Sequence, residues 1–324
     1  MLTDSVLARY KLQWKYIVLI VLVVLGLALR LHEIHYNLDG DEVLSVKRAN
    51  KQFAEVISGS LQNIAHPPLH LVLLHLWVKV FGPSEASARS LSVLFSAVFL
   101  WMSYRLFCRF VSPWLALGVL SIVAVSPWFV YYGQQARPYA LVALLSTANV
   151  LAFVRVLEQP AERGRMVAWT VSSTLLLYAQ YLGVLLIAFQ IGFAVFYLQS
   201  ERRRLLACGS LAVALIVPWA GAAMGGKILS TTDPLLRYMS WIGPPAPMDL
   251  VRFYVSVFGE APGMQTRWLF VILVVLGAAY VRHATVSRNL PAHNLFFFLL
   301  AFGLPAVVTS CRYWGQSPSL RLDK

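Results

Sequence analysis

The chain has 324 residues, of which 59% are hydrophobic and only 13% are charged, and its formal net charge is +13. The charged share is about half that of an ordinary soluble domain, and long apolar runs repeat along the whole sequence, which excludes a soluble globular protein. In a membrane protein, Lys and Arg anchor cytoplasmic loops beside anionic lipid, so the positive charge does not indicate a nucleic-acid partner. The three cysteines are scattered and lack metal-ligand spacing, which argues against a disulfide framework or a zinc site.

The apolar runs predict an all-α, polytopic membrane protein with about nine spanning helices. The first run has a basic flank like a signal peptide, but no small-residue cleavage site follows it, so we expect an uncleaved helix. The stretch from Met166 to Leu198 is long enough for two crossings, with a break at Gly183. The predicted spans are Tyr16–Leu31, Ala88–Phe107, Pro113–Tyr132, Pro138–Val156, Met166–Tyr181, Gly183–Leu198, Leu205–Met224, Trp268–Val281 and Leu295–Ser310.

Every second connection between these spans is short and rich in Arg or Lys. The positive-inside rule places such loops in the cytoplasm, so the alternate connections should face the outside. Among the outward connections are two long loops, Glu33–Ser87 and Gly225–Arg267.

This orientation requires that His66–Phe81 does not cross the bilayer, because otherwise every later basic loop would lie on the wrong side. The segment has too few apolar residues for a span and is interrupted by His70, His75 and Lys79. We therefore expect a helix that lies along the outer membrane surface.

The preceding segment, Glu42–Ile57, is expected to form a similar amphipathic surface helix. Its apolar residues recur at helical spacing, whereas Lys47 and Arg48 occupy the other face. Asp41 should lie at or near the N-cap of this helix, where exposed backbone N–H groups stabilise a carboxylate.

Asp39, Asp41 and Glu42 gather within four positions directly after the first span. Such a group can be a solvated turn that leads into a helix cap. Charge held this close to a bilayer is costly, however, and commonly marks function. His66 precedes a pair of prolines, a pattern that is also typical of a helix start.

Arg89 and Arg137 are expected at the outer side of the membrane, where arginines commonly anchor to phospholipid headgroups. A divalent metal is left open for the histidines and carboxylates of the first loop, although their spacing matches no established motif. The residues in question are His32, His35, Asp39, Asp41, Glu42 and His66.

A series of short motifs follows the first span in a fixed order. The series comprises DE at Asp41-Glu42, HPPL at His66–Leu69, LWVKVFG at Leu76–Gly82, Arg89 within ASARSLSVLFSA, QARPYALVALL at Gln135–Leu145 and YAQYLG at Tyr178–Gly183. This order resembles the GT-C glycosyltransferases of the dolichyl-phosphate-mannose protein mannosyltransferase and lipid A aminoarabinose transferase group. The resemblance covers the chain from about Tyr16 to Gly183.

The sequence departs from that family in two respects. Gln180 stands where a histidine is usual, so a role of that histidine is not carried over. Family members also have more C-terminal spans, and the final CRYWGQSPSLRLDK resembles a motif that normally leads into another helix. The chain is therefore expected to be naturally short or truncated.

The resemblance implies transfer of a sugar from a polyprenyl-phosphate carrier to an acceptor hydroxyl, with inversion, on the extracytoplasmic face of a bacterial inner membrane. The acceptor is a glycan, a lipid or a protein. By the same resemblance, residues 1–224 form the catalytic membrane module with the first loop at 33–87, residues 225–267 cover the site, and residues 268–324 form the C-terminal helices. No cofactor is expected, although related enzymes differ on metal.

The implied chemistry assigns roles to the residues, because a hydroxyl nucleophile needs a carboxylate base and a departing phosphate needs positive charge. We expect Asp41 to act as general base, with Glu42 or Asp39 shaping its field and contacting acceptor or sugar. The cations expected to face the carrier phosphate are His66, Arg89 and Arg137, with Lys47 and Arg48 guiding anionic lipid.

Two other functions stay open from the sequence. A carrier-lipid flippase or transporter would need polar or charged residues along its spans, and none of the predicted spans carries Asp, Glu, Lys or Arg near its middle. A membrane scaffold that retains the fold of a lost enzyme is the second alternative.

Overall fold

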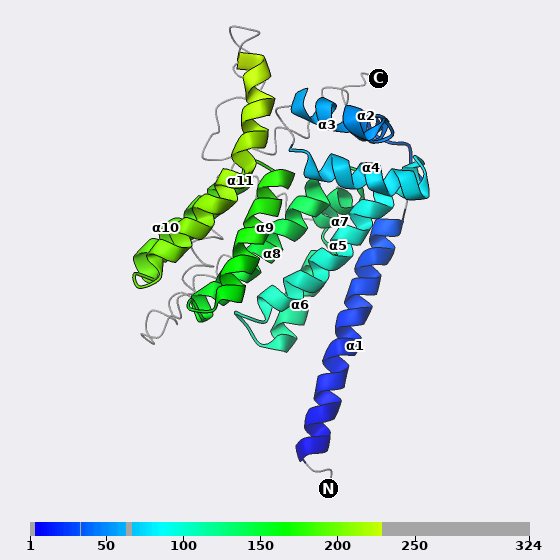
Figure 1. The fold of residues 1–324 in the computed structure, drawn as a ribbon. Helices are drawn as coiled ribbons and strands as arrows, with labels where there is room; N and C mark the ends of the chain where they lie inside the picture. Colours follow the sequence, from blue (N-terminus) through cyan, green and yellow to red (C-terminus); the bar gives the residue numbers. More distant parts are fainter. Residues whose placement is uncertain (1–3, 33, 63–66, 229–324) are drawn as a thin grey trace, which may run out of the picture. The chain divides into compact units, whose positions relative to one another are not determined.

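The computed structural model describes residues 4–32, 34–62 and 67–228 (Figure 1). The part of the chain up to Met224 forms one compact unit. His66, the loop Gly225–Arg267 and the predicted spans Trp268–Val281 and Leu295–Ser310 lie outside the described residues. The further division of the chain into functional domains remains a prediction.

Every regular element in the described ranges is a helix, which confirms the all-α prediction. In chain order the helices are α1 (Asp4–Leu31), α2 (Gly40–Ala49), α3 (Phe53–Gln62), α4 (Leu69–Phe81), α5 (Glu85–Phe107), α6 (Pro113–Val125), α7 (Pro127–Gln134), α8 (Tyr139–Glu158), α9 (Arg163–Ala179), α10 (Gly183–Tyr197) and α11 (Arg202–Ile228).

Four of the described helices are long and apolar enough to cross a membrane, which confirms a multi-pass membrane protein. They are α1 over Gln13–Leu31, α5, α8, and α11 over Arg202–Ala223. The pair α6 and α7 adds a fifth span if the two helices are counted as one broken crossing.

The predicted span Pro113–Tyr132 is not one straight helix, because α6 and α7 meet at a bend of 59°. Pro127 lacks a backbone N–H and cannot continue the hydrogen-bond ladder of α6, so a new helix starts at this residue. The bend directs the end of α7 toward α1, where the Gln134 side-chain amide donates to the carbonyls of Leu29 (3.2 Å) and His32 (2.6 Å).

The break predicted at Gly183 is confirmed, since α9 ends at Ala179 and α10 begins at Gly183. A Cβ atom at this position would lie 2.7 Å from the Leu176 side chain, so only glycine allows the two helices to approach this closely. With 17 and 15 residues, α9 and α10 are shorter than the roughly 20 residues that a straight span requires.

The helix predicted for Glu42–Ile57 is wrong as a single element, because it is divided into α2 and α3. The α2 helix ends at Ala49 and is capped by Asn50, whose backbone N–H donates to Val46 O at 2.9 Å. The chain leaves the helical path before Phe53. Asparagine readily caps a helix and is a poor helix former, which explains the break that apolar spacing alone did not indicate.

The helix expected within His66–Phe81 is α4, which starts directly after the two prolines. It ends at Gly82, whose φ of 84° favours glycine. Its 13 residues extend only about 20 Å, too little to cross a bilayer core. In Figure 1, α4 lies across the ends of the long helices α1 and α5. That α4 rests on the membrane surface remains a prediction.

An apolar cluster joins α2, α4, α5 and the turn before α8. Its buried members are Val46, Ala49, Leu74, Val78, Ala88, Leu91 and Ala136. The ring Nδ1 of His75 lies 2.7 Å from Ala49 O and adds a polar contact between α4 and α2. These contacts fix the short helices against the long ones and thereby determine where the side chains of α2 point.

Deeper among the long helices, α8, α9 and α10 share a fully buried polar chain of hydrogen bonds. The Trp169 indole donates to Gln190 Oε1 (2.7 Å), the Gln190 amide donates to Asn149 Oδ1 (2.7 Å), and Asn149 donates to Ser173 Oγ (2.8 Å). Side-chain hydrogen bonds of this kind hold membrane helices together where no hydrophobic force acts between them.

The substitution Gln190→Leu should lower the thermal unfolding midpoint of the purified protein, because it leaves Trp169 and Asn149 buried without their partner. We expect a loss of about 1–2 kcal/mol. Thr170→Val is the matched control, since its hydroxyl donates only within α9, to Met166 O. The double variant Gln190→Leu/Asn149→Leu should lose less than the sum of the single losses. Additive losses would contradict a connected chain.

Candidate functional site

The acidic group after α1 is organised by a capping box at the start of α2. Asp39 is the N-cap residue, and its side chain accepts from the first turn. Asp41 lies two positions later in that turn, near the N-cap as predicted. The Glu42 carboxylate reaches back and accepts from the Asp39 backbone N–H at 3.0 Å. Two backbone donors that a helix start leaves unpaired are satisfied in this way.

Glu42 is 2% exposed and forms an ion pair with Arg89 of α5. Its Oε1 accepts from Arg89 Nε (3.1 Å) and from the Ala136 backbone N–H (2.7 Å), and its Oε2 accepts from Arg89 Nη2 (2.7 Å) in addition to Asp39. Burial acts to raise the pKa of Glu42. The hydrogen bonds from Arg89, Ala136 and Asp39 and the Arg89 charge outweigh it and lower the pKa below the ordinary value. The carboxylate is therefore ionised at neutral pH.

Arg89 is also buried, and all five of its N–H donors are used within the protein. Apart from the two bonds to Glu42, it donates to the backbone carbonyls of Ile34, Tyr36 and Asn37. Arg89 thus ties the segment between α1 and α2 to α5. Each guanidinium donor of Arg89 has a protein acceptor in this arrangement. A contact between Arg89 and the carrier phosphate stays a prediction.

The third segment held by Glu42 is the turn between α7 and α8, residues 135–138. Ala136 of this turn is fully buried and donates to Glu42, and Ser92 of α5 donates to the carbonyl of Gln135. The turn therefore has a fixed position relative to α2 and α5, which determines where Arg137 lies.

Asp41 and Arg137 form a second ion pair next to the buried one, with 3.2 Å between Oδ2 and Nη2. The Asp41 side chain is 55% exposed, whereas the Arg137 side chain is 12% exposed. Arg137 Nε is buried and has no hydrogen-bond partner in the described part of the chain. Asp41 therefore presents a solvent-accessible carboxylate, and Arg137 keeps one guanidinium donor that has no protein acceptor among the described residues.

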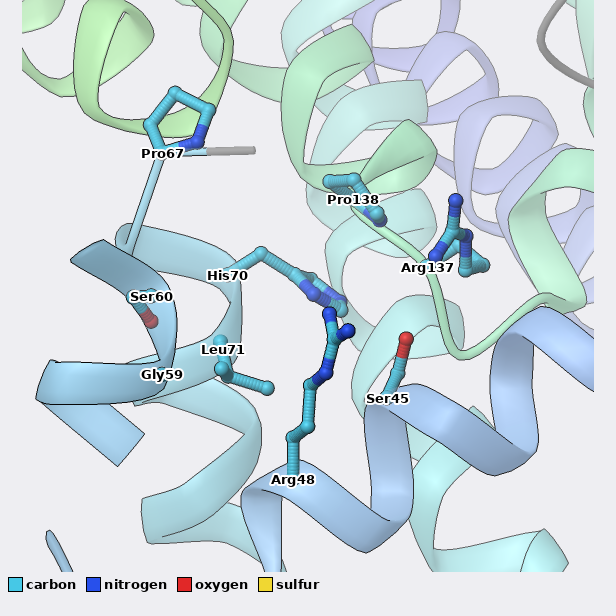
Figure 2. Close-up of a pocket in the computed structure, with 9 residues that line it drawn as sticks. All are labelled: Ser45, Arg48, Gly59, Ser60, Pro67, His70, Leu71, Arg137 and Pro138. Atoms are coloured by element: carbon cyan, nitrogen blue, oxygen red, sulfur yellow. The ribbon is translucent and has the colours of Figure 1, made fainter. Parts of the chain in front are cut away.

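A cavity lies beside Arg137, between α2, α3, α4 and the turn before α8. Figure 2 shows Arg48 of α2 and His70 of α4 pointing toward one another in this cavity, with Ser45 beside them. The complete lining is Ser45, Arg48, Gly59, Ser60, Pro67, His70, Leu71, Arg137 and Pro138. Two guanidinium groups, an imidazole and hydroxyls around one cavity make a site suited to a phosphate group.

The structure thus brings together Asp39, Asp41, Glu42, Arg48, Arg89 and Arg137, all six of which the sequence had singled out. Lys47 is exposed on α2 and does not line the cavity. Within the described ranges, no group of three or more His, Cys, Asp or Glu side chains is placed to hold a metal ion.

Comparison with known proteins identifies a similar family and a similar structure. Residues 65–221 match the family of dolichyl-phosphate-mannose-protein mannosyltransferases, which confirms the resemblance seen in the motifs. Among solved structures, the chain is similar to an archaeal oligosaccharyltransferase, AglB from Archaeoglobus fulgidus, with a TM-score of 0.52 and 12% sequence identity. The chain has the GT-C membrane fold.

The match to AglB covers 92% of this chain but only 39% of that protein, so the chain spans well under half of AglB's length. AglB was solved in complex with an inhibitory peptide and a dolichol-phosphate. No curated protein sequence matches the chain significantly. The matched family segment contains α4 to α10 and most of α11, whereas the acidic group on α2 precedes it.

His70 lines the cavity but is not among the predicted site residues. In the sequence, His70 only interrupts the apolar segment that forms α4. A histidine within an apolar helix nevertheless indicates a possible functional residue. Ser45 and Ser60 carried no signal, because serine is common on helix surfaces, and only the packing of α2 against α3 and α4 reveals that they share a cavity.

Glu42→Gln should strongly destabilise the protein, because it leaves the Arg89 cation buried without its counter-charge. We expect a loss of about 3–5 kcal/mol, measured as a lower thermal midpoint in detergent. Glu55→Gln serves as the control, since Glu55 pairs with Lys51 on the surface of α3 and both side chains are more than half exposed. Similar midpoints for the two variants would show that the buried pair does not hold the site together.

Proposed function

We propose that the chain is an integral-membrane glycosyltransferase that moves one sugar from a polyprenyl-phosphate carrier to an acceptor hydroxyl, with inversion. The observation that carries the proposal is the accessible Asp41 carboxylate beside a cavity lined by Arg137, Arg48 and His70. The family match and the GT-C fold support a glycosyltransferase of this class. The dolichol-phosphate bound to AglB supports a polyprenyl-phosphate donor.

In the proposed reaction, Asp41 is the general base. The acceptor oxygen forms a bond to the anomeric carbon while the bond from that carbon to the phosphate oxygen breaks. The electron pair departs with the lipid phosphate, and the acceptor proton passes to Asp41. A phosphate is a stable leaving group, so this reaction needs no second carboxyl to protonate it, unlike glycoside hydrolysis.

The cations have two different tasks in this proposal. Arg137 and Arg48, with His70, bind the carrier phosphate and stabilise the charge that it gains as the bond breaks. Arg89 is a positioning residue instead, because its donors are all used in holding Glu42 and the preceding backbone. The assignment of His66 to the phosphate rests on the sequence alone.

The proposed location is the extracytoplasmic face of a bacterial inner membrane. The distribution of basic residues supports it, since Arg105, Arg155 and Arg163 lie at the ends of α5, α8 and α9 that are remote from Asp41. The positive-inside rule places those ends in the cytoplasm. Lys47 and Arg48 would then meet anionic lipid at the outer surface.

Asp41→Asn should remove at least 99% of the transfer activity, because an amide cannot accept the acceptor proton. The measurement uses purified protein and a panel of radiolabelled polyprenyl-phosphate hexoses and pentoses, with released or transferred sugar counted. The thermal midpoint should change little, since Asp41 is exposed and its ion pair is weak. Glu55→Gln is the carboxylate control and should keep full activity. Near-normal turnover by Asp41→Asn would overturn the assignment of the base.

Arg48→Gln should raise the apparent KM for the lipid donor about tenfold or more, because a charge-assisted hydrogen bond to the phosphate contributes roughly 1.5–3 kcal/mol. The KM for the acceptor should stay within twofold. Lys47→Gln is a closely matched control, since it removes the same charge from the adjacent residue, outside the cavity. Equal effects of the two variants on donor KM would indicate general attraction to lipid and contradict a phosphate site in the cavity.

A further inference from the structure

A second cavity lies near the other end of α8, between this helix and the start of α9. It is lined by Arg109, Ala152, Arg155, Glu162, Gly164, Arg165 and Ala168, and its volume is about 380 Å³. Volumes of this size are typical of sites that bind small molecules. The first cavity includes Pro138, directly before α8 begins at Tyr139. Arg155 follows Tyr139 by sixteen residues in one unbroken helix, so the two cavities are about 24 Å apart along α8.

Two acidic residues fix part of this cavity. Arg109 Nη1 donates to both carboxylate oxygens of Glu158, at 3.1 Å each, and Arg165 Nη1 donates to Glu158 Oε2 at 3.3 Å. Arg165 also donates to Glu162, to Gln159 Oε1 and to the backbone carbonyl of Arg155. The guanidinium of Arg165 is therefore largely occupied within the protein, and it serves to shape the wall of the cavity.

Arg155 differs from its neighbour. Within the described residues its guanidinium makes no hydrogen bond, although the side chain is only partly exposed and lines the cavity. The positive charges of Arg109, Arg105 and Arg165 act on it, opposed by Glu158. A partly buried guanidinium with unused donors among further cations favours an anion that can accept two parallel hydrogen bonds.

We propose that this cavity binds the phosphate group of an anionic phospholipid, with Arg155 as the main contact and Arg109 as the second. The cavity lies where the spanning helices α5 and α8 end, which is the level at which lipid headgroups meet a membrane protein. Basic pockets between membrane helices are known to bind anionic headgroups in this way. A soluble phosphate shares the same chemistry. The inference does not depend on the transferase reaction.

The test compares the full-length protein in nanodiscs of phosphatidylcholine alone and with added phosphatidylglycerol. The wild type should show a higher thermal midpoint with phosphatidylglycerol, and native mass spectrometry should show that lipid retained. Arg155→Gln should lose the stabilisation and reduce retention at least tenfold. Arg155→Lys, which keeps the charge but not the planar fork, should bind at an intermediate level.

Arg163→Gln is the charge-matched control, because Arg163 is exposed on the first turn of α9 and does not line the cavity. It should keep at least half of the lipid retention. Equal losses in Arg155→Gln and Arg163→Gln, or no preference for phosphatidylglycerol, would overturn the proposal. Inorganic phosphate should neither stabilise the protein nor displace the lipid at millimolar concentration. If it does both, the site belongs to a soluble phosphate and the lipid assignment is wrong.

Discussion

The candidate site depends on one buried ion pair, that of Glu42 and Arg89. Through it, α2, α5, the segment after α1 and the turn before α8 all meet at two side chains. Two buried charges are costly to desolvate, and such a pair persists where hydrogen bonds satisfy every donor and acceptor, as they do here. The result is a rigid frame beside which the Asp41 carboxylate is exposed to solvent and the mostly buried Arg137 lines the cavity.

The number of occupied guanidinium donors separates the arginines that support the fold from those that we propose to bind a ligand. Arg89 and Arg165 have nearly all their donors occupied by protein acceptors, and each of them holds a wall in place. Arg137 and Arg155 lie beside them with donors that the described residues do not fill. Residue type and approximate position are the same in each pair, so the count of satisfied donors is the observation on which the two proposed tasks are distinguished.

Within the described ranges, apolar periodicity predicted the long helices α1, α5, α8 and α11 and the break at Gly183. It did not reveal the bend at Pro127 or the division of α2 from α3, because both depend on how a helix end is satisfied locally. The acidic group could be found from its place after the first span. That Glu42 is buried and Asp41 is exposed could not be predicted, because burial depends on which side of α2 packs against α5. His70 of α4 and Ser60 of α3 line the cavity only because these helices pack against α2, which the sequence does not indicate.

Asp41 and Glu42 are adjacent in the chain, yet they point about 100° apart around α2, which is the rotation between consecutive helical residues. One acid therefore faces the interior and the other faces the aqueous side. The extra methylene of glutamate lets residue 42 accept from four N–H donors of three residues, whereas the shorter Asp41 side chain pairs with Arg137. The order of the two residues therefore matters although the net charge does not depend on it. A chain with Glu at position 41 and Asp at position 42 would have the same net charge, but its buried carboxylate would be too short to hold the surrounding segments together.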